Sequence, residues 1–156
     1  MKIALGADHR GFQIKEKVKT LLGSLGYEVL DCGTDSPSSC DYPDMAYPAC
    51  KAVTSGQAES AILFCGTGIG MSIAANKVRG VRAALCHDEF TAEMSRRHNN
   101  ANILCLPADL IGEELTRRIV EAWLKTRFEG GRHERRIRKI AEVEDRQCSD
   151  NPPQQG

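Results

Sequence analysis

The chain has 156 residues, of which 41% are hydrophobic and 27% are charged, a composition typical of one globular domain. Lys and Arg together number 21, as do Asp and Glu, so the formal net charge is zero. This balance argues against a protein that attracts nucleic acid or anionic membrane through its bulk charge, although it leaves room for a local basic patch.

Short apolar runs alternate along the chain with segments whose apolar residues recur at helical spacing. Gly26 ends the first helical segment, Pro48 leaves the start of the second uncertain, and Asp88 is a suitable N-cap for the fourth. In chain order we expect strand 2–8, helix 11–25, strand 27–31, helix 45–55, strand 60–65, helix 70–78, strand 81–86, helix 88–97, strand 101–106, helix 110–127 and a basic helix 132–145.

Strands that alternate with helices, with inner strands apolar throughout, predict an α/β fold with a parallel sheet covered on both faces. We expect a doubly wound, five-stranded, three-layer α/β/α domain over residues 1–145, with a C-terminal helical extension and a disordered tail over 146–156. The expected strand order is 2-1-3-4-5, in which the carboxyl ends of the first and third strands meet at the topological switch point. Asp8 and His9 would then lie beside the loop that begins at Cys65.

The cysteines form no C-x-x-C pair and are not interleaved with the four histidines at zinc-ligand spacing. We therefore expect free thiols in a reducing compartment, and no metal. The amino terminus, MKIALGADHRGF, reaches charged residues too early for a signal peptide, and no apolar run approaches the length of a membrane span. These features predict a cytoplasmic protein.

The most specific local signal is CGTGIGMS at residues 65–72. Three alternate glycines after a buried strand let the backbone turn tightly and aim its N–H groups at one point, and the following helix adds the positive end of its dipole. Such a loop suits an anion or a developing oxyanion. The alternative is a strand-to-helix turn whose glycines serve packing alone.

Two other loop types fit this sequence less well. A dinucleotide site needs G-x-G-x-x-G, whereas this loop has G-x-G-x-G. Asp88 and Glu89 follow the next strand at roughly the distance of a ribose-binding carboxylate, so this alternative stays open. A phosphatase loop with Cys, five residues and Arg is excluded, because Met71 stands at the Arg position.

Cys65 ends the strand at the mouth of this loop, where backbone amides and a helix N-terminus can lower the pKa of a thiol. The alternative is an inert buried cysteine, as expected for Cys86 and Cys105. His98, which we place with Asn99 at the carboxyl side of the sheet, could transfer protons near neutral pH, or could cap a helix C-terminus. The Asp8-His9-Arg10 turn has a similar ambiguity.

Arg132 and Arg136 are four residues apart, so they share a helix face and could clamp one phosphate. The alternative is a solvated basic face. A nucleic-acid patch is disfavoured by the zero net charge and the few aromatic residues nearby.

Taken together, GADHRGF, DYPD, CGTGIGMSIAANK, SRRHNNAN and FEGGRHERR resemble the ribose-5-phosphate isomerase type B family, in the right order and over about residues 1–145. That family includes relatives that act on galactose 6-phosphate and allose 6-phosphate. The resemblance implies a Rossmann-like sheet, no cofactor, and a homodimer or dimer of dimers with active sites between subunits. The implied reaction interconverts ribose 5-phosphate and ribulose 5-phosphate.

The resemblance also implies roles by position. Cys65 would be the base that shuttles a proton between C1 and C2 of an enediolate, and Thr67 would assist proton movement between the oxygens. His98, supplied with Asn99 by the partner chain, would open the furanose ring with support from Asp8. The implied contacts with enediolate, sugar and phosphate are the amides of Gly66, Gly68, Ile69 and Gly70, and the side chains of His9, Tyr42, Asn99, Arg132 and Arg136.

These roles agree with the chemistry, because aimed amides and a thiolate are what removal of a proton beside a carbonyl requires. A remote phosphate would supply binding energy that fixes the reacting carbons. Some members use a glutamate on the loop as base, but Met71 stands there in this chain. Many members carry an arginine at the position of Asp109, and an acid there could weaken phosphate binding or shift the substrate unless it points away.

Two alternatives stay open. The chain could isomerise a six-carbon sugar phosphate or a free sugar. It could also be a non-catalytic phosphate- or nucleotide-binding module that uses the loop as a cradle, although a pure cradle needs neither the cysteine nor the histidine.

Overall fold

The computed structural model describes residues 1–150, and the side chains of residues 1–147. Five strands and six helices alternate along this part of the chain. The strands are β1 (Lys2–Ala7), β2 (Glu28–Asp31), β3 (Ser60–Cys65), β4 (Ala83–Leu85) and β5 (Ile103–Pro107). The helices are α1 (Phe12–Ser24), α2 (Tyr42–Thr54), α3 (Ile69–Ala75), α4 (Glu89–Asn99), α5 (Glu113–Lys125) and α6 (Arg132–Asp150). None of these helices is long and apolar enough to cross a membrane.

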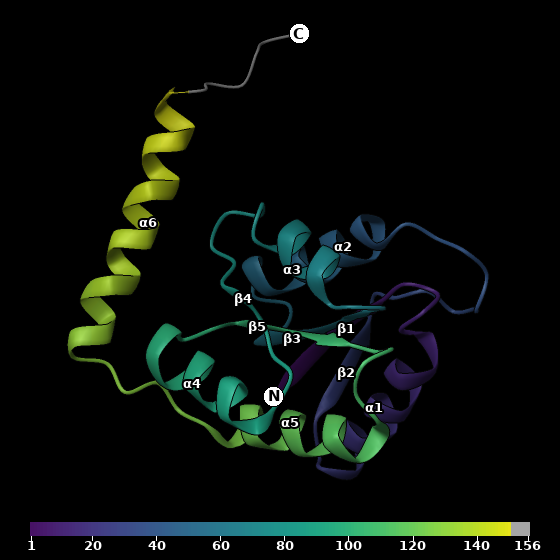
Figure 1. The fold of residues 1–156 in the computed structure, drawn as a ribbon. Helices are drawn as coiled ribbons and strands as arrows, with labels where there is room; N and C mark the ends of the chain where they lie inside the picture. Colours follow the sequence, from purple (N-terminus) through teal and green to yellow (C-terminus); the bar gives the residue numbers. More distant parts are fainter. Residues whose placement is uncertain (151–156) are drawn as a thin grey trace, which may run out of the picture.

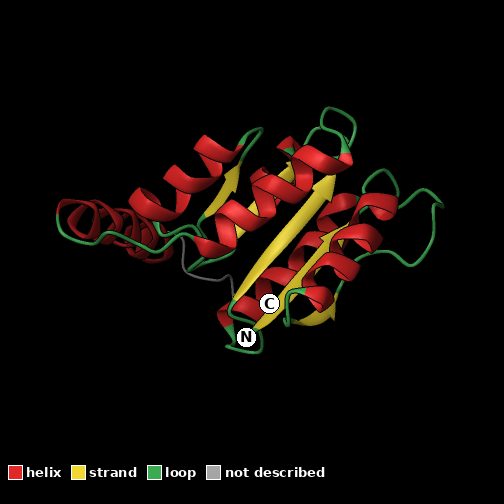
Figure 2. Cartoon of the chain, turned by 90° about the horizontal axis from the view of Figure 1, so that it is seen from below, coloured by secondary structure: helices red, strands yellow, loops and turns green. Residues whose placement is uncertain are grey.

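The fold class is confirmed: a parallel sheet lies between two layers of helices (Figure 1). Helices α1, α4 and α5 cover one face, seen in front of the strands in Figure 2, and α2 and α3 cover the other. Each face has its own apolar core, because successive side chains of a strand point to opposite faces. In β3, Ile62 and Phe64 pack under the first layer, and Ala61 and Leu63 pack under the second.

Several predicted boundaries shift by a few residues for identifiable reasons. Helix α2 begins at Tyr42 because Pro43 lies in its first turn, where proline is tolerated, and it continues through Pro48. The N-cap prediction for Asp88 is confirmed, since its carboxylate accepts a hydrogen bond from the Thr91 amide at 2.7 Å. Helix α6 runs beyond the predicted end at residue 145, and the remaining tail, 151–156, lies outside the described residues.

The predicted strand order was wrong: the observed order is β2-β1-β3-β5-β4. Strand β5 is buried throughout, whereas β4 has three half-buried residues, so the more apolar strand takes the inner position. The Asn102 side chain links the starts of the two strands, because it accepts from the Arg82 amide at 2.7 Å and donates to the Gly80 carbonyl at 2.9 Å. As a result, the turn after β5, and not the turn after β4, lies beside the end of β3.

A partly buried ion pair ties α1 to β2. Lys15 is 1% exposed, and its Nζ donates to both carboxylate oxygens of Asp31, at 2.9 and 2.7 Å. Lys19 also donates to Asp31, at 2.8 Å. Burial opposes ionisation of Asp31, but the hydrogen bonds from Lys15, Lys19 and the Gly33 amide outweigh it and hold the pKa of Asp31 below its ordinary value.

We predict that Asp31→Asn lowers the free energy of unfolding by about 1–3 kcal/mol at pH 7, because Lys15 loses a charged partner. A lowered folded-state pKa contributes stability above the unfolded-state pKa, about 3.9, and that stability is lost as the pH falls through the folded-state pKa. Stability of the wild type should therefore fall more steeply below pH 4 than that of the variant. Urea unfolding at pH 7 and pH 3 measures both effects.

Glu28→Gln is the matched control, since Glu28 lies on the same strand, is 74% exposed and contacts Lys2 only at 3.6 Å. Equal unfolding midpoints for the two variants would contradict a stabilising role of the partly buried pair.

Candidate active site

The loop after β3 has the shape that its glycines predict. Gly68 is the N-cap of α3 and has φ +72°, a left-handed conformation that glycine adopts without strain. Within the described residues, the amides of Gly66, Thr67 and Gly68 donate no backbone hydrogen bond. The backbone therefore leaves N–H groups available at the point where β3 ends.

Cys65 is the last residue of β3 and is 5% exposed. Burial raises the pKa of the deeper Cys50 to about 11 and raises the pKa values of Cys86 and Cys105 above the ordinary value. Those thiols stay protonated at neutral pH, which supports the prediction that Cys86 and Cys105 are inert. The expected free thiols are found at Cys32, Cys40, Cys50, Cys65, Cys86 and Cys105.

The turn after β1 lies beside this loop, as predicted. Asp8 is 5% exposed, and its Oδ1 accepts from the amides of Arg10 at 2.9 Å and Gly11 at 3.1 Å, which shapes the turn into α1. The Asp8 amide donates to the Phe64 carbonyl at 3.2 Å, so the turn is attached to the end of β3. His9 Nδ1 lies 3.3 Å from both the amide nitrogen and the carbonyl oxygen of Cys40, and it holds the loop before α2.

Tyr42 and Thr67 complete this group. Tyr42 is 40% exposed, and its ring lies 2.8 Å from the place that a Cβ on Gly70 would take. Thr67 is exposed, and its Oγ1 accepts from the Ile69 amide at 3.4 Å. We call this set the loop cluster, and it consists of Asp8, His9, Tyr42, Cys65 and Thr67.

His98 and Asn99 do not lie with the loop cluster, and their predicted place at the carboxyl side of the sheet was wrong. Helix α4 starts where β4 ends and runs back past the sheet, so its last residues lie at the amino ends of the strands. Arg82 Nε, just before β4, donates to the Asn99 carbonyl at 3.1 Å. Five residues of β5 at about 3.3 Å each separate the two edges by roughly 16 Å.

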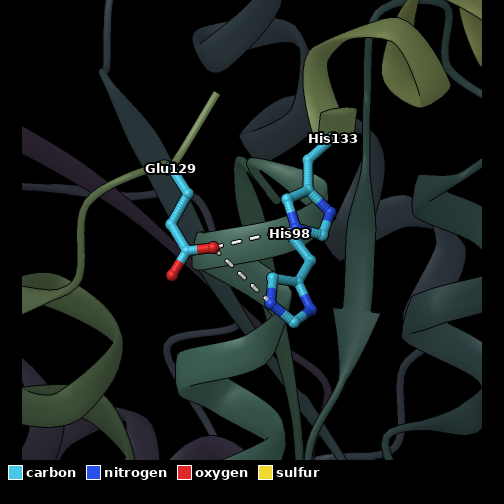
Figure 3. Close-up of side chains that lie close together, drawn as sticks. All are labelled: His98, Glu129 and His133. Atoms are coloured by element: carbon cyan, nitrogen blue, oxygen red, sulfur yellow. Dashed lines mark ion pairs between the residues drawn. The ribbon is translucent and has the colours of Figure 1, made fainter. Parts of the chain in front are cut away.

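His98 belongs to a second group, on α4, the start of α6 and the segment between α5 and α6. Glu129 directs one carboxylate oxygen toward both imidazoles, 3.8 Å from His98 Nε2 and 3.7 Å from His133 Nε2 (Figure 3). The rings of His98 and His133 stack, with centroids 4.1 Å apart and planes 4° from parallel. Arg97 also pairs with Glu129.

His133 is 4% exposed, and burial, helped by the positive charges around it, lowers its pKa. Arg132 and Arg136 begin α6 on a shared face and are both exposed. Arg132 Nε lies 3.4 Å from His133 Nε2. We call this set the histidine–arginine cluster, and it consists of His98, Asn99, Glu129, Arg132, His133 and Arg136.

His98, Glu129 and His133 each offer a ligand atom within 4.8 Å of the others, the composition of a metal site. The ring geometry does not suit one ion. A metal must lie in the plane of each imidazole, along the nitrogen lone pair, and two parallel stacked rings share no such point. Arg97 and Arg132 beside the group add positive charge, so the arrangement fits an ion-pair cluster better.

The dinucleotide alternative is not supported by the topology. The Asp88 carboxylate is used to cap α4, and Asp88 follows β4, which β5 separates from β3. The acidic pair therefore does not follow a strand adjacent to the glycine loop, as a ribose-binding carboxylate would.

Two contacting residues, Glu129 and His133, were missed from the sequence as site candidates. Glu129 joins two histidines from different helices. His133 adjoins Arg132, but nothing local indicated that it stacks on His98. The sequence singled out Asp109 but not its contact with Arg10, whose Nε donates to Asp109 Oδ2 at 2.6 Å. The contacts of His98 and of Asp109 join residues distant in sequence.

Comparisons with known proteins agree with this geometry. A family model described as ribose/galactose isomerase matches residues 3–140. The chain is 45% identical to the ribose-5-phosphate isomerase B of Escherichia coli (strain K12), over 93% of this chain and 97% of that protein.

Two solved structures are also similar. Clostridium thermocellum ribose-5-phosphate isomerase B superposes with a TM-score of 0.93 at 48% identity, covering 94% of this chain and 99% of the other. Mycoplasma genitalium ribose-5-phosphate isomerase B, solved with bound ribulose-5-phosphate, superposes with a TM-score of 0.88 at 40% identity, covering 92% and 96%. The chain therefore belongs to the ribose/galactose isomerase family, which confirms the resemblance to the type B ribose-5-phosphate isomerases.

Proposed function

We propose that the protein interconverts ribose 5-phosphate and ribulose 5-phosphate through a 1,2-enediolate. The observation that carries this proposal is the placement of Cys65 at the mouth of a loop in which the amides of Gly66, Thr67 and Gly68 have no backbone partner among the described residues. Membership in the ribose/galactose isomerase family supports the reaction class.

In the proposed reaction the Cys65 thiolate removes the proton from C2 of the open-chain aldose. The electron pair moves toward the carbonyl oxygen, and the amides of the 66–70 loop stabilise the resulting enediolate. Thr67, which is exposed beside them, transfers a proton between the two oxygens. Cys65 then returns its proton to C1, which gives the ketose and restores the thiolate.

The sugar is cyclic before this step, so a second acid–base group has to open the ring. We assign this role to His98, with Asn99 as a sugar contact. Because these two residues lie at the opposite edge of the sheet from Cys65, one chain does not contain a complete site. The proposal therefore includes a homodimer, or a dimer of dimers, in which the histidine–arginine cluster of one subunit faces the loop cluster of another.

An apolar surface beside the loop supports this assembly. Four large side chains of α2 and α3 are exposed there: Tyr42 is 40% exposed, Tyr47 58%, Ile69 52% and Ile73 58%. Tyr47 and Ile73 line a groove together with Tyr42, which belongs to the loop cluster, and Ile69 follows the loop directly. A subunit docked on this surface would bring its own residues close to the loop cluster.

The phosphate of the sugar would bind to His9 of one subunit and to Arg132 and Arg136 of the other. The family description covers both ribose and galactose isomerases, so a six-carbon phosphate is the second candidate substrate, and a free sugar is the third. Asp109 is the specific reason to test them, since it places an acid beside the loop. A non-catalytic cradle is less well supported, because it gives Cys65 no role.

We predict that Cys65→Ala lowers kcat for ribose 5-phosphate by about 10²–10⁴-fold, the usual contribution of a positioned base. The measurement is time-resolved formation of ribulose 5-phosphate in the presence of EDTA. Cys32→Ala is the matched control, since Cys32 is half-buried away from the loop, and it should stay within about threefold of wild type. A folded Cys65→Ala protein with near-normal turnover would contradict the role of Cys65 as the base.

The shared site can be tested by mixing inactive chains. Cys65→Ala and His98→Ala should each be nearly inactive alone, but dimers formed from an equimolar mixture should recover about a quarter of wild-type activity. Half of randomly formed dimers are mixed, and each mixed dimer has one intact site if Cys65 and His98 act across the interface. No recovery in verified mixed dimers would mean that the two residues do not act together across subunits.

Substrate choice is tested separately by comparing kcat/KM for ribose 5-phosphate, allose 6-phosphate and free ribose. We expect ribose 5-phosphate to be preferred over free ribose by at least about tenfold, because the phosphate supplies binding energy that holds the reacting carbons. Equal turnover of free ribose would rule out the phosphate contacts assigned to Arg132 and Arg136.

A further inference from the structure

An ion pair that the proposed mechanism does not use lies directly on the Cys65–Gly70 loop. Arg10 Nε and Asp109 Oδ2 are 2.6 Å apart. A Cβ on Gly66 would lie 2.6 Å from Asp109 Oδ2 and 2.9 Å from Arg10 Nε, so the pair occupies the space that a side chain at Gly66 would need.

Both partners are held there by the backbone of the two strands that flank β3. The Arg10 amide donates to Asp8 Oδ1 at 2.9 Å, in the turn after β1. The Asp109 amide donates to the Gly66 carbonyl at 3.0 Å, and the Ala108 amide donates to the Cys65 carbonyl at 2.9 Å, in the turn after β5. The position of the pair is therefore fixed relative to Cys65.

The pair leaves part of the guanidinium available. Asp109 accepts a hydrogen bond only from Nε of Arg10, and within residues 1–147 the two Nη nitrogens of Arg10 have no hydrogen-bond partner. The Arg10 side chain is 58% exposed. A guanidinium with a free pair of N–H donors matches two oxygens of a phosphate, while an exposed ion pair contributes little to folding stability.

We propose that Arg10 binds the phosphate group of the substrate, and that Asp109 is the residue that positions it. The proposal rests on the proposed function, since it assumes a phosphorylated sugar at this loop. It also accounts for an acid beside an anion site: the charge of Asp109 is compensated by Arg10, and its carboxylate orients the guanidinium so that the Nη edge faces outward.

The first test replaces Arg10 with methionine, which keeps an unbranched apolar stem and removes the charged guanidinium. Arg10→Met should raise both KM for ribose 5-phosphate and the inhibition constant of inorganic phosphate by about tenfold, the loss expected for one charged hydrogen-bonding partner. The ratio of kcat/KM for ribose 5-phosphate to that for free ribose should fall by a similar factor. Thermal unfolding checks that the variant is folded.

Lys17→Met is the matched control. Lys17 is another exposed cation near the same surface groove, and it is likewise paired with an acid, Glu113, but it lies on α1 away from Gly66. Its KM and phosphate inhibition should stay within about twofold of wild type. If Arg10→Met behaves like Lys17→Met, the phosphate role of Arg10 is wrong.

A double variant tests Asp109. Arg10→Met leaves the Asp109 carboxylate uncompensated beside the substrate anion. Adding Asp109→Asn should therefore lower KM at least about threefold from its value in Arg10→Met. A double variant no better than Arg10→Met would contradict the proposed compensation of the Asp109 charge by Arg10.

Phosphate binding by Arg10 can be tested even if the proposed function is wrong. If the wild type isomerises no sugar phosphate, the function fails, and calorimetric binding of inorganic phosphate to wild type and Arg10→Met still decides whether Arg10 binds phosphate.

Discussion

Strand β3 pairs with β1 on one side and β5 on the other, and every group of the loop cluster takes its place from this pairing. All six residues of β3 are buried, so the strand runs through the middle of the sheet and can end only at its edge. Parallel strands end on the same side, so the turns after β1, β3 and β5 converge. Asp8, Cys65 and Asp109 meet for this reason, although they are far apart in the sequence.

The same geometry keeps the loop cluster and the histidine–arginine cluster apart in one chain. A helix that joins two parallel strands must run back across the sheet, so α4 carries His98 to the edge opposite Cys65. Helix α6 then stands beside α4 at the β4 edge and adds its arginines to the same group (Figure 1). The two clusters are thus the two ends of one parallel sheet, and the exposed apolar side chains of α2 and α3 lie next to only one of them.

Individual ion pairs, and not the net charge, set the positions of several charged side chains in this molecule. The chain has no net charge, yet cations face solvent near both clusters. Arg132 and Arg136 are exposed at the start of α6, whereas Arg10 is held by Asp109. The buried Lys15 is compensated by Asp31 and Glu16, where an unpaired charge would be costly. Pairing fixes the direction of a charged side chain, which is what recognition of a phosphate requires.

Local signals were sufficient for much of the fold and the loop cluster. The run 60–65 is continuously apolar, so it is a buried strand in any arrangement, and the glycines after it require a tight turn whatever surrounds them. These local signals did not predict the strand order, because residues 81–86 and 101–106 are similar apolar runs. Only packing in the folded sheet decides that β5 takes the inner position and β4 the edge. The direction of α4 follows from the parallel sheet, because a helix between two parallel strands runs back to their amino ends, and this direction separates His98 from Cys65.

The sequence by itself thus determined the alternation of strands and helices, the glycine turn after Cys65 and the family to which the chain belongs, since each depends on residues close together in the chain. Only the tertiary structure decided that Arg10 pairs with Asp109, that Glu129 joins His98 to His133, and that the two clusters face away from each other. The contacts of Asp109 with Arg10 and of His98 with Glu129 and His133 join residues 31 to 99 positions apart, and the separation of the clusters follows from strand order. These contacts form only when the fold brings distant segments together.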